Sequence, residues 1–106
     1  MVDFTLTASA IDTLLKSMDG ASQVEQYKAY ASIITLSHEI EKYYKRFGIT
    51  DCYVDEKLSE LRYYAAHSAG LITDGKSQDL YIRWSSGALK SMISSLELLG
   101  FEQKYR

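Results

Sequence analysis

The chain of 106 residues contains no proline, although about five would be usual at a frequency of roughly 5%. Because proline removes a backbone donor and breaks helices, its absence permits long, uninterrupted helices. Cysteine occurs once, at Cys52, which excludes an intramolecular disulfide and a cysteine-rich metal site. We therefore expect a reducing, intracellular environment, a small buried thiol at Cys52, and no bound metal or cofactor.

The sequence also lacks a surplus of one charge. Twelve basic and fourteen acidic residues are spread along the chain and give a net charge of -2. A protein built mainly to neutralise nucleic-acid phosphates usually has a basic surplus or a basic stripe. The charge balance therefore argues against that class of protein.

Long apolar runs are absent as well. No run approaches the roughly 18–20 residues that a helix needs to span a membrane. The first residues, MVDFTLTASAIDTLLK, have neither the basic start nor the uninterrupted apolar stretch of a signal peptide. We expect a cytoplasmic protein that does not enter a membrane.

The residues that are present indicate one folded domain covering 1–106. The chain is 46% hydrophobic and 25% charged, which is ordinary for a globular protein and unlike a disordered tail. Its length suffices for a single modest core. Nine tyrosines are many for this length. Since a tyrosine combines an apolar ring with a polar tip, this number favours large contact surfaces.

Apolar residues recur at helical spacing in four segments, and glycines fall near most of their ends. We expect helices over Thr7–Asp19, from the capping box Ser22–Glu25 onward, from about Asp51–Asp55 to Gly70, and over Ser77–Leu99. Their apolar stripes are Phe4, Ala8, Ile11, Leu15 and Met18; Ala29, Ile33, Leu36, Ile40, Tyr44 and Phe47; Val54, Leu58, Leu61, Ala65 and Ala69; and Ile82, Ser85, Leu89, Met92, Ile93 and Leu96. Short links predict antiparallel neighbours, hence an all-α, up-and-down four-helix bundle.

Two polar residues, Arg62 and His67, are separated by four residues near the end of the third predicted helix. This spacing resembles the Arg-x4-His signature of the HEPN family, helical bundles that often act as metal-independent ribonucleases. The resemblance covers these two residues and the layout of about Val54–Leu99. It implies that a dimer cleaves RNA, with Arg62 steadying the phosphate and His67 acting as general acid or base for attack by a 2′-hydroxyl.

Helix geometry favours a different interpretation of the same pair. At about 100° per residue, five steps place Arg62 and His67 roughly 140° apart, so they do not share a face. His67 aligns with Tyr63 on the side away from the leucines, whereas Arg62 lies at the edge of the core stripe. We expect an exposed His67 and an Arg62 that covers the core edge; a joint site would need a bent helix or a dimer.

A second candidate site interleaves the bases Lys42, Lys45 and Arg46 with the aromatic residues Tyr43 and Tyr44. Such a pattern could follow a nucleic-acid strand. The favoured alternative is that these cations lie in the last turns of the second helix, where they complement the helix dipole.

The fourth predicted helix carries a second surface besides its core stripe. Small residues recur every four positions between larger apolar ones, and this predicted partner interface comprises Leu80, Trp84, Gly87, Ser91, Ser95 and Leu98. Small residues let another backbone approach closely, and the larger ones would anchor the contact. The alternative is that Ser91 and Ser95 simply face water.

These patterns favour a non-catalytic interaction module that self-associates or binds and regulates a protein partner, in a phage or a bacterium. The HEPN-like ribonuclease, or an inactive relative of it, is the first alternative. The second is a small phage-type nucleic-acid-packaging or inhibitor protein. The tail LELLGFEQKYR resembles the C-termini of some small terminase subunits of tailed phages, but the third predicted helix has no counterpart in that pattern, so no function is based on it.

Overall fold

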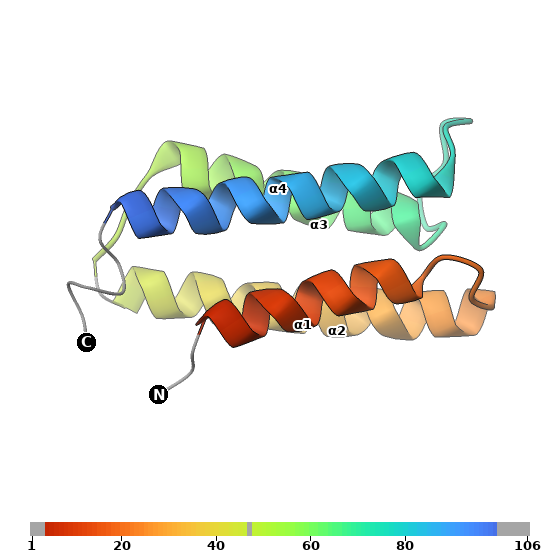
Figure 1. Ribbon diagram of the computed structural model, residues 1–106, viewed down its shortest axis with the longest axis horizontal. Coiled ribbons are helices and arrows are strands. Elements are labelled where there is room, and N and C mark those ends of the chain that lie inside the picture. The colour runs from red at the N-terminus through yellow and green to blue at the C-terminus, as the bar shows by residue number, and fades with distance from the viewer. Residues whose placement is uncertain (1–3, 47, 100–106) are drawn as a thin grey trace.

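The computed structural model describes residues 4–46 and 48–99 of the chain. Within these ranges the chain forms helices α1 (Phe4–Ser17), α2 (Gln23–Arg46), α3 (Cys52–Ser68) and α4 (Gln78–Leu98), and no strand. Each helix runs opposite to the one before it, as Figure 1 shows. The predicted all-α, up-and-down four-helix bundle is therefore confirmed, although α1 begins at Phe4 rather than Thr7 and ends before Asp19.

Side-chain caps begin the later helices where the sequence predicts them. The N–H of Glu25 donates to Ser22 Oγ (3.3 Å) at the start of α2. Asp51 Oδ1 accepts the N–H of Val54 (3.0 Å) before α3, and Ser77 Oγ accepts the N–H of Leu80 (3.3 Å) before α4. Each cap satisfies a donor that has no partner within the helix.

The end of α3 is fixed by a glycine. Gly70 has a φ of 78°, a left-handed conformation that glycine adopts without steric cost. In this conformation the N–H of Gly70 reaches the carbonyl of His67, and the N–H of Leu71 reaches that of Ala66, both at 3.0 Å. This pattern ends the helix and turns the chain into the loop 69–77.

Residues from all four helices form the core. Helices α1 and α2 lie side by side as one pair, α3 and α4 form the second, and contacts between α1 and α4 and between α2 and α3 join the pairs (Figure 1). The largest fully buried apolar side chains are Ile11, Leu15, Met18, Ile33, Tyr44, Val54, Leu58, Leu61, Met92 and Leu96. Leu36 and Ile93 are only partly buried against this core. Phe47 and the side chain of Phe4, both predicted on core stripes, lie outside what the structure describes.

Short side chains let α3 and α4 pack closely. Ala65 and Ala66 on α3, Ala69 directly after it, and Ser85 and Ala88 on α4 are all buried. Of the described helix pairs, α3 and α4 share the most extensive contact. The second hairpin is therefore the more tightly packed half of the bundle.

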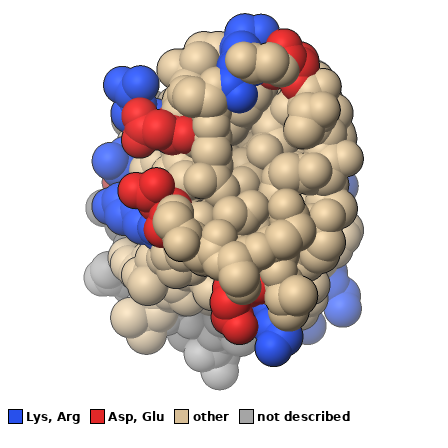
Figure 2. All heavy atoms as spheres, turned by 90° about the vertical axis from the view of Figure 1, so that its right-hand side faces the viewer, with Lys and Arg blue, Asp and Glu red and all other residues tan. Residues whose placement is uncertain are grey.

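Three glutamines donate to backbone carbonyls near the hairpin loops at one end of the bundle, and the bond from Gln23 to Ala69 joins the two hairpins. Gln23 Nε2 donates to the carbonyl of Ala69 (2.6 Å), and Gln78 Nε2 donates to that of Ser68 (2.8 Å). Gln26 Nε2 donates to the carbonyl of Ala21 (2.9 Å). Carbonyls near the ends of helices thus find partners inside the protein. Figure 2 shows this end of the molecule, with uncharged residues across its middle and charged residues around its rim.

Candidate functional site

Arg62 forms a polar network with α2. Its Nε donates to Ser37 Oγ (3.0 Å), and its Nη2 donates to Glu41 Oε1 (3.0 Å) and lies 3.1 Å from His38 Nδ1. Partial burial alone would raise the pKa of the Glu41 carboxyl, but hydrogen bonds from Arg62 and Lys45 lower it. We call these four residues, Arg62, Ser37, His38 and Glu41, the Arg62 network; it ties α3 to α2.

His67 lies on the opposite side of α3 and contacts α4. Its ring stacks on Tyr81, with centroids 4.1 Å apart and an interplanar angle of 8°, and Tyr63 approaches at 4.7 Å and 76°. The side chain is only 6% exposed, so the prediction of an exposed His67 is wrong. The helical wheel of α3 could not reveal this burial, because the cover comes from α4. The prediction that Arg62 and His67 do not share a face is confirmed.

Burial of His67 leaves both ring nitrogens unpaired. Neither Nδ1 nor Nε2 has a hydrogen-bond partner among the described residues. A neutral imidazole offers one donor and one acceptor, and leaving such a group buried and unsatisfied costs about 1–3 kcal/mol. His67 is thus an exception, among the described residues, to the pairing of buried polar groups.

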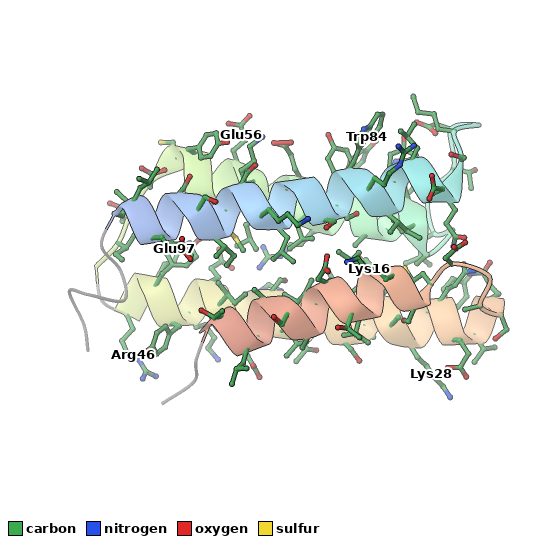
Figure 3. All side chains as sticks on the ribbon, viewed as in Figure 1. Lys16, Lys28, Arg46, Glu56, Trp84 and Glu97 are labelled. Atoms are coloured by element: carbon green, nitrogen blue, oxygen red, sulfur yellow. The ribbon has the colours of Figure 1, made fainter. Side chains whose placement is uncertain are left out.

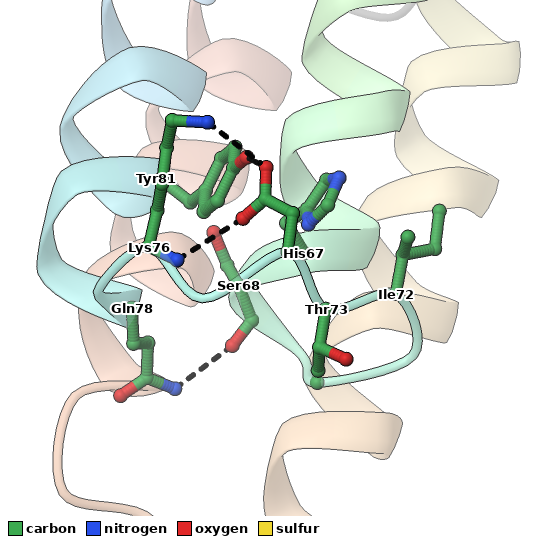
Figure 4. Close-up of a pocket in the computed structure, with 9 residues that line it drawn as sticks. His67, Ser68, Ile72, Thr73, Lys76, Gln78 and Tyr81 are labelled. Atoms are coloured by element: carbon green, nitrogen blue, oxygen red, sulfur yellow. Dashed lines mark hydrogen bonds and ion pairs between the residues drawn. The ribbon is translucent and has the colours of Figure 1, made fainter.

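A cavity of about 180 Å³ adjoins this imidazole (Figure 4). We call it the His67 pocket; it is lined by His67, Ser68, Gly70, Ile72, Thr73, Asp74, Lys76, Gln78 and Tyr81. Asp74 accepts hydrogen bonds from the Tyr81 hydroxyl and from the N–H and Nζ of Lys76, the last two at 3.1 Å. The bond from Tyr81 is the main cause that lowers the pKa of Asp74 to about 2, and the same bond, with burial, raises the pKa of Tyr81 to about 12.

Two shallow depressions lie one after the other along the outer side of α3 and α4, and together we call them the α3–α4 groove. Its first part, about 340 Å³, is lined by Lys57, Glu60, Tyr64, Arg83, Trp84, Gly87, Ala88 and Ser91. Its second part, about 260 Å³, is lined by Asp51, Tyr53, Ser95, Leu98 and Leu99. On each helix these residues recur at three- and four-residue spacing and therefore follow one face.

The groove brings together most of the interface predicted on the fourth helix. Trp84, Gly87 and Ser91 line the first part, and Ser95 and Leu98 line the second, whereas Leu80 is half-buried beside them. The opposite wall, Tyr53, Lys57, Glu60 and Tyr64 on α3, was not predicted. Its signal is present in the sequence as a stripe with spacings of four, three and four residues on the side of α3 away from the leucines.

Trp84 is the central aromatic residue of the groove. It is 40% exposed, and its ring lies 5.6 Å from that of Tyr64 and 5.3 Å from that of Tyr81, nearly perpendicular to the latter. Figure 3 shows its side chain pointing away from the α1–α2 pair. Tyr64 and Tyr81 thus contact the Trp84 ring, while 40% of the residue stays exposed.

Gly87 lies in the interior of α4, next to Trp84 in the groove. A Cβ atom added at this position would meet nothing within 4 Å among the described residues. Its backbone conformation is not one of the positive-φ conformations that favour glycine. The packing and the backbone of the described chain therefore give no reason for a glycine here.

The predicted nucleic-acid residues do not form an aromatic platform. Lys42 and Arg46 are exposed, and Figure 3 shows Arg46 at the edge of the bundle, while Lys45 Nζ pairs with Glu41 Oε2 at 3.1 Å. Tyr44 is fully buried and donates a hydrogen bond to Asp55 Oδ1 (2.7 Å); burial first, and this bond second, raise its pKa. Its ring therefore cannot stack on a base.

Cys52 is exposed as the first residue of α3. The prediction of a buried thiol is wrong, because this position precedes the part of α3 that packs against the core. Among the described residues, no three His, Cys, Asp or Glu side chains lie together in a way that could hold a metal ion. None of the described helices is long and apolar enough to cross a membrane.

Comparison of the chain with protein-family models, with curated proteins and with solved structures finds no match. The resemblance to the HEPN family therefore remains a prediction from Arg62 and His67.

Proposed function

We propose that this protein is a non-catalytic interaction module that self-associates by placing the α3–α4 groove of one copy against that of a second. The observation that carries the proposal is Gly87. A glycine in a helix interior costs about 1 kcal/mol relative to alanine, and neither the packing nor the backbone conformation of the described chain requires one here. A backbone that approaches closely from another molecule would require it.

The surroundings of Gly87 support an interface. Trp84 is exposed beside it, and apolar exposure continues along the groove to Tyr53 and to Leu98, which is 88% exposed. Isolated monomers rarely expose long apolar surfaces of this kind. Aromatic residues at the centre of a patch are typical of protein interfaces, and a tryptophan is a common anchor.

The charges of the groove favour a second copy as the partner. Lys57 and Arg83 line the same part of the groove as Glu60. In a two-fold contact the same patch meets itself, so the acid of each copy can face a base of the other. A partner with a surplus of one charge would meet like charges somewhere along the groove.

Ser91→Arg tests the proposal, because a long charged side chain would fill the groove beside Gly87. The matched control is Ser32→Arg, the same change at an exposed position on α2. We expect Ser91→Arg to abolish concentration-dependent association while helicity stays unchanged, and Ser32→Arg to behave like the wild type. Trp84, the only tryptophan in the chain, should fluoresce at longer wavelength once the second copy leaves.

Three outcomes would contradict the proposal. Ser91→Arg could associate as the wild type does, or unfold the chain, which would place Ser91 in the core. The wild type could also stay monomeric and instead bind a different protein through Trp84. That third result would keep the groove as a binding site but replace its occupant.

The ribonuclease suggested by the Arg-x4-His spacing has less support. The Arg62 guanidinium already contacts three side chains of α2. The His67 ring is stacked against Tyr81. The expected result for the wild type is no cleavage of RNA. Cleavage that disappears in both Arg62→Lys and His67→Gln would favour the ribonuclease over the interaction module.

A further inference from the structure

The two walls of the α3–α4 groove differ in the size of their side chains. The residues that α3 contributes are all large: Tyr53, Lys57, Glu60 and Tyr64. On α4, by contrast, Gly87 and Ala88 lie side by side, and Ser91 follows one turn later. Two backbones come close only where both carry small side chains. The helix of a second copy that approaches Gly87 is therefore α4 itself, not α3.

The shape of the groove also decides the direction of that second α4. If the two α4 helices met in parallel about a two-fold axis, Trp84 would meet Trp84 of the second copy, and the two indole rings would hold the backbones apart at Gly87. The two α3 helices would then lie on opposite sides of the α4 pair, which would leave Tyr53 and Lys57 uncovered. An antiparallel contact has neither fault, because it brings α4 over α4 and α3 over α3.

An antiparallel contact also places large residues of α4 opposite small ones. With the two-fold axis beside Gly87, Trp84 of one copy faces Ser91 of the other, and Leu80 faces Ser95. Each large side chain thus enters a space that a small one leaves open. The 40% of Trp84 that is exposed in one copy is covered by the other.

The charges near this axis are compensated in the same arrangement. Lys57 and Glu60 line the same part of the groove as Gly87, and they form an ion pair at 3.1 Å within one copy. Where two antiparallel α3 helices face each other, Glu60 of each copy also lies near Lys57 of the other. Two bases and two acids then alternate around the axis, so that like charges need not meet.

We propose that the second copy binds antiparallel to the first, with α4 facing α4 at Gly87, α3 facing α3, and Trp84 of each copy seated against Ser91 of the other. This inference rests on the proposed self-association and adds its direction and register. Each copy completes the other's groove, because Trp84 finds its cover only on the opposite molecule.

Distances between spin labels on the two copies test this arrangement. Asp79 and Glu97 are exposed near opposite ends of α4 and line neither part of the groove. At about 1.5 Å per residue they lie about 27 Å apart along the helix axis. Each is replaced by cysteine and labelled in the full chain carrying Cys52→Ser, because Cys52 is exposed and would otherwise react with the label.

Double electron–electron resonance is then measured on each labelled protein alone and on a mixture of the two. In an antiparallel pair, identical labels lie at opposite ends, so each protein alone should give a distance above about 25 Å. The mixture should add a distance below about 20 Å, from Asp79→Cys of one copy to Glu97→Cys of the other. Adding Ser91→Arg to both proteins should abolish all of these distances.

The contrary results separate this inference from the self-association on which it rests. Short distances in each protein alone and a long one in the mixture would show a parallel pair, which would overturn the inference while self-association stands. The absence of any distance between copies at high concentration would contradict self-association itself and, with it, this arrangement. Unchanged distances in the Ser91→Arg proteins would place the contact outside the groove and overturn both.

Discussion

The two polar residues that stand out in α3 lie in opposite kinds of surroundings. Arg62 faces α2, where Ser37, His38 and Glu41 occupy its guanidinium group. His67, five residues later, faces α4 and the loop 69–77, and its nitrogens have no partner among the described residues. Polar groups that hold a fold together satisfy one another. A buried polar group that the fold leaves unsatisfied lowers stability, and His67 is such a group.

Arg62→Ala should lower the stability of the protein more than any of the other substitutions changes it. It removes donors to Glu41 and Ser37 at a site where the side chains of Arg62 and Glu41 are 24% and 22% exposed. We expect the free energy of unfolding to fall by about 2–3 kcal/mol, because the partly buried Glu41 carboxylate keeps Lys45 but loses Arg62, and Ser37 loses a donor. Urea denaturation followed by circular dichroism measures this; a loss below about 0.5 kcal/mol would show that the Arg62 network is only a surface ion pair.

His67→Phe should raise the free energy of unfolding, and by less than Arg62→Ala lowers it. Phenylalanine keeps a ring against Tyr81 but removes two unpaired nitrogens. We expect the free energy of unfolding to rise by up to about 1 kcal/mol. The same denaturation measurement applies. A marked loss of stability would mean that His67 has a structural partner, and the contrast with Arg62 would disappear.

Gly87→Ala should change stability and association in opposite directions. The new methyl group has open space and alanine favours the helix, so the monomer should gain up to about 1 kcal/mol. The same methyl group would keep a second backbone from the groove, so dimerisation should weaken. Ser32→Ala on α2 is the control, with a smaller gain and no change in association. Stronger or unchanged association in Gly87→Ala would argue against close approach at this position.

The smallest effect concerns pH and the bond between Asp74 and Tyr81. Folding lowers the pKa of Asp74 from 3.8 to about 2. The contribution of Asp74 to folding stability is therefore present above pH 3.8 and is lost as the pH falls through about 2. Folding raises the pKa of Tyr81 from 10.0 to about 12, so its contribution is present below pH 10 and is lost as the pH rises through about 12.

Melting temperatures of the wild type and Tyr81→Phe across the pH range measure this effect. The difference between the two proteins should be constant between about pH 4 and pH 10 and should shrink outside that window. A difference that already changes near neutral pH would assign the effect to other groups.

Local patterns in the sequence predicted the helices because their signals are local. Ser22, Asp51 and Ser77 cap the helices that follow them, and the apolar stripes form most of the core. The same rules placed Arg62 and His67 on different faces of α3. The boundaries of α1 were less accurate, because no capping box marks its start in the sequence.

The surroundings of His67 could not be predicted from α3 alone. Its burial depends on Tyr81, which α4 brings back across it, and its pocket depends on Asp74 and Lys76 in the connecting loop. Wheel arguments treat each helix separately and therefore miss such contacts. Helical-wheel arguments also predicted the α4 wall of the groove, with Trp84 and Gly87. They did not predict the α3 wall, with Lys57 and Tyr64.

Sedimentation equilibrium of the wild-type chain is the most direct test of self-association through the α3–α4 groove. The chain has a mass of 12.0 kDa, so we expect the measured mass to rise with concentration to about twice that value. In Ser91→Arg it should stay at 12.0 kDa over the same range, while Ser32→Arg follows the wild type. A wild-type mass of 12.0 kDa at every concentration, with Trp84 fluorescence equally unchanged, would contradict the account.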